Sequence, residues 1–207
     1  MSGIAEAEAI IGLISAIIAI IDAAKRVYDA ASDATGLPEA FREVAQRLPL
    51  VKVTLLTVER EADAGHWDAS RSAAVKKTLE SSQTKSTKLE KIFKDVIPGE
   101  TASRIDRYVA AARTLGKGSR VETLMKGILD DMSLVAGNQV AGLSEAIAAI
   151  SELKPSLTAE QLPEQDVGYS HSGSGDINHV EGNQYVNKGA GKQYNFGTVT
   201  TLNLGEN

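Results

Sequence analysis

The chain has 207 residues, no cysteine and a formal net charge of -5, and 43% of its residues are hydrophobic. This length suits one ordinary domain plus an appendage, and the apolar fraction is sufficient for a core. The absence of cysteine excludes disulfides, thiol nucleophiles and cysteine-ligated zinc. The acidic balance, without a run of Lys or Arg longer than two, argues against nucleic acid as a partner.

Residues 9–21 read AIIGLISAIIAII and carry no charge. A secretory signal peptide has a positive region before its apolar core, whereas Glu6 and Glu8 precede this one, so we reject secretion. A helix over these residues rises only about 20 Å, against a hydrocarbon core of about 30 Å. A permanent membrane span is therefore disfavoured, and a conditional one is possible.

At rest, we expect residues 4–32 to form the central core helix of the domain. Its small residues recur at spacings that allow close helix packing; they are Gly12, Ala16, Ala19 and Ala23. If the helix is released, we expect it to act on a membrane through Ile10, Ile11, Gly12, Leu13, Ile14, Ile17, Ile18, Ile20 and Ile21.

The helical pattern continues to about residue 153 and is interrupted by Gly and Pro at intervals that suit a bundle. Five helical segments are predicted, at about residues 4–32, 37–63, 67–96, 101–115 and 119–154. Because no strand pattern occurs among them, helix-on-helix packing is the expected core. The predicted fold class is all-α, a bundle of about five helices followed by a disordered tail that is able to form cross-β amyloid.

Apolar residues at helical spacing predict the buried faces of three segments. In the second segment Pro49 should kink the helix rather than end it, and in the third the polar stretch SSQTKST is expected to loosen or break it. Ser119 and Glu122 have capping-box spacing at the start of the fifth. The predicted core positions are Phe41, Val44, Leu48, Val51, Leu55 and Val58; Val75, Leu79, Leu89, Ile92, Phe93 and Val96; and Leu124, Ile128, Met132, Val135, Val140, Leu143, Ile147 and Ile150.

No motif in the chain has the spacing of a catalytic or metal site. The stretch GKGS at residues 116–119 follows a helix and has Gly118 where a phosphate-binding loop needs Ser or Thr. The neighbouring acids Asp130 and Asp131 are most simply solvated charges on a helix. We therefore expect no catalytic residue, no metal and no cofactor.

The composition changes after Pro155, because six of the seven Asn and eight of the 18 Gly lie in residues 166–207. Residues 156–167 are expected to be a polar linker, and residues 168–207, the C-terminal tail, a separate module. The motif G-x-Q-Y occurs twice, beginning at Gly182 and at Gly191, with a weaker relative, GDIN, beginning at Gly175. Ordinary disorder is the simplest interpretation of a Gly-rich terminus.

Alternation of Asn and Gln with strand-forming residues favours a second interpretation, stacking of identical chains in cross-β order. Such a tail would be disordered alone, because it has too few apolar residues to offset its ordering entropy, and ordered when templated. The candidate amyloid motif comprises Gly175, Ile177, Asn178, Gly182, Asn183, Gln184, Tyr185, Val186, Asn187, Gly191, Gln193, Tyr194, Asn195 and Phe196.

The stretch GLPEAFREVAQRLPLVKVTLLTVE at residues 36–59, behind AEAIIGLISAIIAIIDAAKRVYD at residues 7–29, resembles the SesA-type domain. Domains of this type, which are HeLo-like, occur at the N-terminus of fungal NACHT and other P-loop NTPase receptors. The resemblance covers roughly residues 1–155. The C-terminal tail is similar to amyloid signalling motifs of fungal NOD-like-receptor partners, either the sigma type or the pseudo-palindromic type related to the RHIM.

These resemblances imply a fungal cell-death effector. A NOD-like receptor with a matching motif would template the tail into an amyloid homo-oligomer, and the helical domain would then act on membrane lipids. The protein would be cytoplasmic at rest and at the plasma membrane when activated. The alternative is a non-lytic adaptor that only oligomerises and binds another helical domain.

Overall fold

The computed structural model of the chain describes residues 2–31, 35–65, 67–98, 103–116 and 118–162. The chain divides into two units, Met1–Gln165 and Asp166–Asn207. All the described residues belong to the first unit, and the fold below is that of this unit alone.

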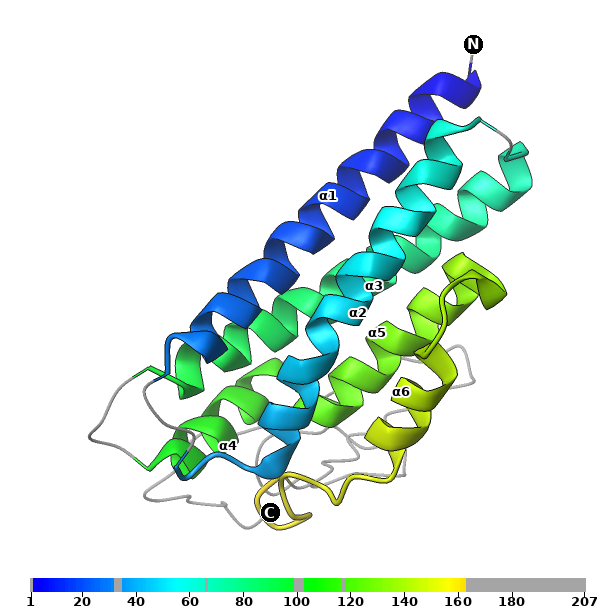
Figure 1. Cartoon of the computed structure of the whole chain (residues 1–207). Helices are drawn as coiled ribbons and strands as arrows, with labels where there is room; N and C mark the ends of the chain where they lie inside the picture. Colours follow the sequence, from blue (N-terminus) through cyan, green and yellow to red (C-terminus); the bar gives the residue numbers. More distant parts are fainter. Residues whose placement is uncertain (1, 32–34, 66, 99–102, 117, 163–207) are drawn as a thin grey trace, which may run out of the picture. The chain divides into compact units, whose positions relative to one another are not determined.

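The described residues form helices connected by short turns, without any strand among them (Figure 1). The predicted all-α class is thereby confirmed. In chain order the elements are α1 (Ser2–Asp29), α2 (Glu39–Asp63), α3 (Ala69–Val96), α4 (Arg104–Leu115), α5 (Val121–Ala136), the 3-10 turn η1 (Gly137–Gln139) and α6 (Leu143–Ser151).

The four long helices α1, α2, α3 and α5 form a four-helix bundle. Helix α1 packs against α2 and α3, and α5 packs against the same two helices on the opposite side. Among the described parts of the chain, no Cα atom of α1 lies within 8 Å of one in α5, and the same holds for α2 and α3, so each of these two pairs lies on a diagonal of the bundle. The shorter helix α4 lies on α3, and α6 lies on α5 and α2.

This arrangement places α1 at the edge of the bundle. Of the four long helices described, it alone has no shorter helix packed on it. The prediction that the first helix is the central core helix is therefore wrong. Helices α2, α3 and α5 each have three helical neighbours, whereas α1 has two.

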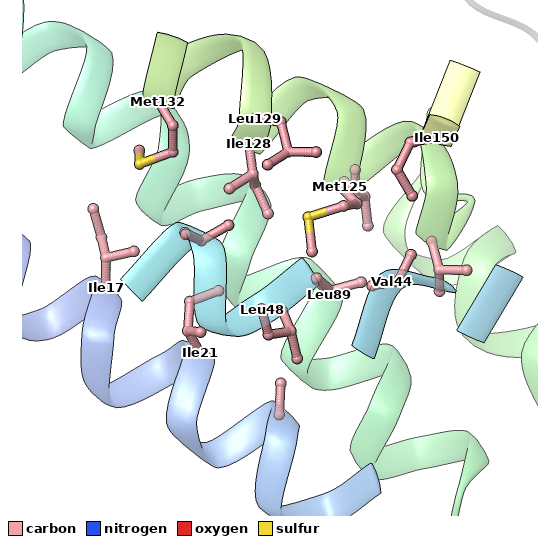
Figure 2. Packing of buried hydrophobic residues seen from close by; sticks show 14 of the residues in the cluster. Ile17, Ile21, Val44, Leu48, Leu89, Met125, Ile128, Leu129, Met132 and Ile150 are labelled. Atoms are coloured by element: carbon pink, nitrogen blue, oxygen red, sulfur yellow. The ribbon is translucent and has the colours of Figure 1, made fainter. Parts of the chain in front are cut away.

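Each long helix buries a stripe of residues in which steps of three and four alternate, the spacing of knobs-into-holes packing in bundles. Figure 2 shows how Ile17 and Ile21 of α1, Leu48 of α2, Leu89 of α3 and Met132 of α5 contribute to one core. The stripes are Ile10, Ile14, Ile17, Ile21 and Ala24; Val44, Leu48, Val51, Leu55, Val58 and Ala62; Val75, Leu79, Ser82, Ser86, Leu89, Phe93 and Val96; and Val121, Met125, Ile128, Met132 and Val135.

The core positions predicted in the second and third segments are all buried, and those of the last segment are buried except Val140 and Ile147, which are partly buried. Helix α2 runs through Pro49 without ending, as predicted. The last segment is not one helix. Gly137 and Gly142 have φ angles of +56° and +87°, which glycine adopts at little cost. They end α5 and precede α6, so that α6 folds back onto α5 and α2.

Helix α3 is continuous through the polar stretch SSQTKST, so the expected break does not occur. Ser82 and Ser86 from this stretch occupy two successive core positions of the stripe and are almost fully buried. Within the described part of the chain, neither hydroxyl oxygen has a hydrogen-bond partner. A buried hydroxyl without a partner destabilises the folded state.

We therefore expect Ser82→Ala and Ser86→Ala each to raise the free energy of unfolding, by about 1 kcal/mol. Alanine removes the unpaired oxygen and has the higher helix propensity. Urea denaturation followed by circular dichroism measures the change. Ser70→Ala on the exposed part of α3 is the control, and should gain only a few tenths of a kcal/mol. A loss of stability in either buried variant would show that its hydroxyl has an unrecognised partner.

Asp131 is not the solvated charge that was predicted, because its side chain is buried between α5 and α3. Lys85 donates to Asp131 Oδ2 at 2.7 Å, to Ser81 Oγ at 3.0 Å and to the carbonyl oxygen of Gly127 at 3.3 Å. A Cβ at Gly127 would lie 3.1 Å from the Lys85 side chain, so the glycine provides room for it. Burial raises the pKa of Asp131 although Lys85 favours its ionised form.

Candidate functional site

Helix α1 separates the predicted membrane-active residues into two groups. Ile10, Ile14, Ile17 and Ile21 point into the bundle and are buried. The others do not reach the centre of the core: Ile11, Leu13, Ile18 and Ile20 are partly buried, and Gly12 is exposed. One face of the helix is therefore buried and the other is at least partly exposed to solvent, although the residues of both faces are apolar over residues 9–21.

The outer face of α1 (Gly12, Ser15, Ala16, Ala19 and Ala23) contains the small residues noted in the sequence. Gly12, Ser15 and Ala19 are exposed, and Ala16 and Ala23 are partly buried. A Cβ at Gly12 would meet no atom within 4 Å in the described structure. Gly12 and Ala19 therefore lie on the surface of the bundle, whereas Ala16 and Ala23 are partly covered by it.

Within the described residues one segment, Glu6–Asp29, is apolar and long enough to cross a membrane. Length and composition alone support this, and the core helix of a soluble protein passes the same test. Polar contacts fix the segment to α2: Lys52 donates to the two carboxylate oxygens of Asp22 at 2.7 and 3.0 Å. Separation of α1 from α2 would break this ion pair.

Aromatic rings pack around the last turn of α1. The ring of Tyr28 lies 6.1 Å from that of Phe93 in α3, and Phe93 lies 5.3 Å from Phe41 in α2, measured between ring centroids. Phe41 in turn meets Tyr108 of α4 edge to face at 4.9 Å. We call these four residues the aromatic row. It connects four helices at the end of the bundle where α1 ends and α2 begins.

Residues 153–162, which we call the C-terminal strap, follow α6 and pack on the bundle. Leu157 and Leu162 are buried, and the carbonyl oxygen of Gln161 accepts a hydrogen bond of 3.0 Å from Arg113 Nε in α4. The described part of the predicted linker, residues 156–162, is therefore docked rather than free. Leucines 157 and 162 explain this, since both bury apolar surface that a free linker would expose.

A buried polar cluster, the clasp, holds the C-terminal strap against α4 and α5. Ser156 donates from its hydroxyl to Glu122 Oε2 at 2.6 Å and from its backbone N–H to Glu122 Oε1 at 3.0 Å. The hydroxyls of Tyr108 and Ser156 lie 2.7 Å apart, and Tyr108 accepts from the backbone N–H of Val121 at 2.8 Å. Since the Ser156 hydroxyl proton goes to Glu122, Tyr108 donates to Ser156.

The clasp replaces the capping box that was predicted for the start of α5. The helix begins at Val121 without a side-chain cap, and Ser119 is buried with no hydrogen-bond partner for its hydroxyl among the described residues. Glu122 turns instead to Ser156, which is 34 residues further along the chain. The prediction failed because a carboxylate that can reach a tertiary partner need not bond to its own helix terminus.

Alkaline pH should weaken the fold through Tyr108. Burial, and secondarily the charge of Glu122, raise the pKa of Tyr108. A raised folded-state pKa gives stability that is present below about pH 10 and is lost as the pH rises further, because only the unfolded chain releases the proton. We expect this group to lower the free energy of unfolding by up to about 1.4 kcal/mol per pH unit above pH 10.

Urea denaturation between pH 9 and 11 measures this dependence, with Tyr108→Phe as the comparison. The variant should be less stable at pH 9 but should lose less stability as the pH rises. Equal slopes for the two proteins would contradict the assignment to Tyr108.

The candidate amyloid residues, Gly175 to Phe196, lie outside the described residues. In the part of the chain that the structure describes, no group of three or more His, Cys, Asp or Glu side chains could hold a metal ion.

A protein-family model described as SesA, the N-terminal domain on NACHT_NTPase and P-loop NTPases, matches residues 14–135. The comparisons with curated proteins and with solved structures find no match. The matched residues are more than half of the chain. They extend from the middle of α1 to the end of α5 and so include part of α1, all of α2 and α3 and nearly all of α5. The chain therefore belongs to the SesA family.

Proposed function

We propose that this protein is a fungal cell-death effector that is switched on by amyloid templating of its C-terminal tail and then acts on the plasma membrane through α1. The observation that carries the proposal is the position of α1 in the bundle. This helix contains the segment that is apolar and long enough to cross a membrane, yet only one of its faces is covered, and only α2 and α3 cover it among the described elements.

The edge position makes release of α1 possible without dismantling the whole bundle. Helices α2 and α3 keep α5 as a common neighbour when α1 leaves, because α5 packs against both of them. Release would expose Ile10, Ile14, Ile17 and Ile21, and insertion into a bilayer would bury this apolar surface again. Both faces of α1 would then contact lipid, and both carry the apolar residues that a membrane helix requires.

Family membership supports the receptor part of the proposal. SesA is the N-terminal domain on NACHT and P-loop NTPases, so a NOD-like receptor with a matching amyloid motif is the partner proposed here. The receptor would template the tail through its two G-x-Q-Y copies, which have the composition of a stacking segment. The protein would be cytoplasmic before this event.

A leakage assay on vesicles containing a trapped dye tests the proposal. The full chain is added either as a monomer or after seeding with fibrils of a peptide covering residues 166–207. We expect leakage only from the seeded protein, together with a cross-β reflection near 4.7 Å from the fibrils. Equal leakage from both forms, or from neither, would contradict membrane action. A peptide that stays soluble through seeding would contradict the templated tail.

A non-lytic adaptor is the second candidate, and one observation favours it. Leu134 of α5 is 76% exposed and borders a hollow of about 420 Å³ that is lined by Val75 and Thr78 of α3 and by Val135. Arg71 and Gln139 also line this hollow, so an exposed leucine lies beside polar groups, an arrangement that suits contact with another protein. Under this alternative, Leu134→Glu should abolish signalling while seeded protein never causes leakage.

A further inference from the structure

The C-terminal strap and the last turn of α1 are connected by an unbroken series of contacts. The series starts at the hydrogen bond between Ser156 and Tyr108. It continues through the aromatic row from Tyr108 to Phe41, Phe93 and Tyr28. Tyr28 belongs to the last turn of α1, which ends at Asp29.

The middle of this series is tightly enclosed. Phe41, Phe93 and Tyr108 have no exposed surface, so a shift of one ring has to be accommodated by its neighbours. Tyr108 is held at both ends of its side chain, by Phe41 at the ring and by Ser156 and Val121 at the hydroxyl. Of these contacts, the one with Ser156 is supplied by the C-terminal strap.

Undocking of the C-terminal strap would leave unfavourable groups behind. The carboxylate of Glu122 would lose the two hydrogen bonds from Ser156, and the hydroxyl of Tyr108 would lose its acceptor. Leu157, which is 1% exposed, would leave its apolar site. A carboxylate that loses its partners draws in water, and hydration beside Tyr108 loosens the packing of the aromatic row.

We propose that the C-terminal strap is a latch for α1: its docking through Ser156 and Leu157 stabilises the last turns of α1 by way of the aromatic row. The latch is a property of the bundle and does not require the proposed function. If that function holds, the latch has a role in activation. The C-terminal strap directly precedes residues 163–207 in the chain, so a force on those residues acts on the strap before it acts on the rest of the bundle.

Contact alone does not establish energetic coupling, so the test measures the coupling itself. The chain has no cysteine, so a single introduced thiol reports local opening by its rate of reaction with 5,5′-dithiobis(2-nitrobenzoic acid). Ala24→Cys places the thiol in the buried stripe of α1 next to its last turn. Ala62→Cys places it in the buried stripe of α2, near the end of that helix. Both alanines are at most 4% exposed.

The latch is weakened by Ser156→Ala combined with Leu157→Ala in the full-length protein, without membranes or seeds. We expect the thiol at position 24 to react at least about tenfold faster, corresponding to about 1.4 kcal/mol, while the rate at position 62 changes by much less. The matched control is Ala159→Ser, at an exposed position of the C-terminal strap, which should leave both rates unchanged. Equal acceleration at both positions, or at neither, would overturn the latch.

Interruption of the aromatic row tests the route. In the Phe93→Leu background, weakening the latch should change the rate at position 24 less than twofold, because the row no longer transmits the change. If Phe93→Leu does not fold, Tyr28→Leu interrupts the row at its half-buried end. An undiminished effect in the interrupted row would overturn the proposed route. None of these rates depends on amyloid or lipid, so failure of the latch and failure of the proposed function are distinguishable.

Discussion

Ile17→Asp is expected to unfold the bundle, whereas Ala19→Asp, two residues further along the same helix, is expected to leave it folded. Ile17 is completely buried, so a carboxylate there has neither water nor a partner. We expect a loss of about 4 kcal/mol or more, which is a large part of the stability of an ordinary domain. Ala19 is exposed, and a charge there should change stability by only about 0.5 kcal/mol.

Thermal denaturation followed by circular dichroism distinguishes the two variants. The midpoint of Ile17→Asp should fall by more than about 10 °C, or the protein should be unfolded at room temperature. A folded Ile17→Asp protein with a wild-type midpoint would contradict the position of α1 in the core.

The same pair gives the sharpest functional experiment, because Ala19→Asp separates folding from membrane action. A charge at this position would lie near the centre of the inserted segment and would cost about 2.5 to 3.5 kcal/mol in a bilayer. Seeded Ala19→Asp protein should therefore form fibrils but cause little leakage. Ala19→Ser, which keeps the position small and uncharged, is the matched control and should leak like the wild type. Full leakage from Ala19→Asp would show that α1 does not insert.

Phe93→Ala is expected to lower the free energy of unfolding by about 3 to 5 kcal/mol. The phenyl ring is fully buried and contacts Phe41 and Tyr28, so alanine removes apolar contacts to two other helices and leaves a cavity. Urea denaturation measures the loss. Leu134→Ala, which truncates a side chain that is 76% exposed, should stay within about 0.5 kcal/mol of the wild type. Similar losses in the two variants would mean that the aromatic row is not part of the core.

Helical periodicity predicted the core of α2 and α3 position by position. Phe41 and Val58 in α2 and Phe93 in α3 are buried as their spacing requires. This succeeded because an amphipathic helix has one way to turn its apolar stripe inward. The interruption between α5 and α6 was missed, although Gly137 and Gly142 were visible in the sequence. Glycine permits a turn without requiring one, and the apolar spacing continues on both sides of it.

Local motifs were less reliable than periodicity, as two capping boxes show. Ser119 and Glu122 have the right spacing and do not form one, since Glu122 finds a partner in Ser156. Thr158 and Gln161 have the same spacing in the stretch predicted to be a linker, and they do bond reciprocally at 2.9 and 3.3 Å. That second signal, together with Leu157 and Leu162, could have identified the docked C-terminal strap from the sequence.

The sequence by itself determined that this protein is a helical bundle with an N-terminal helix apolar on all sides and a tail of different composition. Those properties follow from the order of apolar and polar residues along the chain, which is a local quantity. Only the tertiary structure decided that α1 lies at the edge of the bundle, that Asp131 is buried against Lys85, and that Ser156 and the aromatic row connect the strap to α1. Each of these depends on which helices become neighbours, and contacts between residues distant in the chain leave no periodic pattern in its sequence.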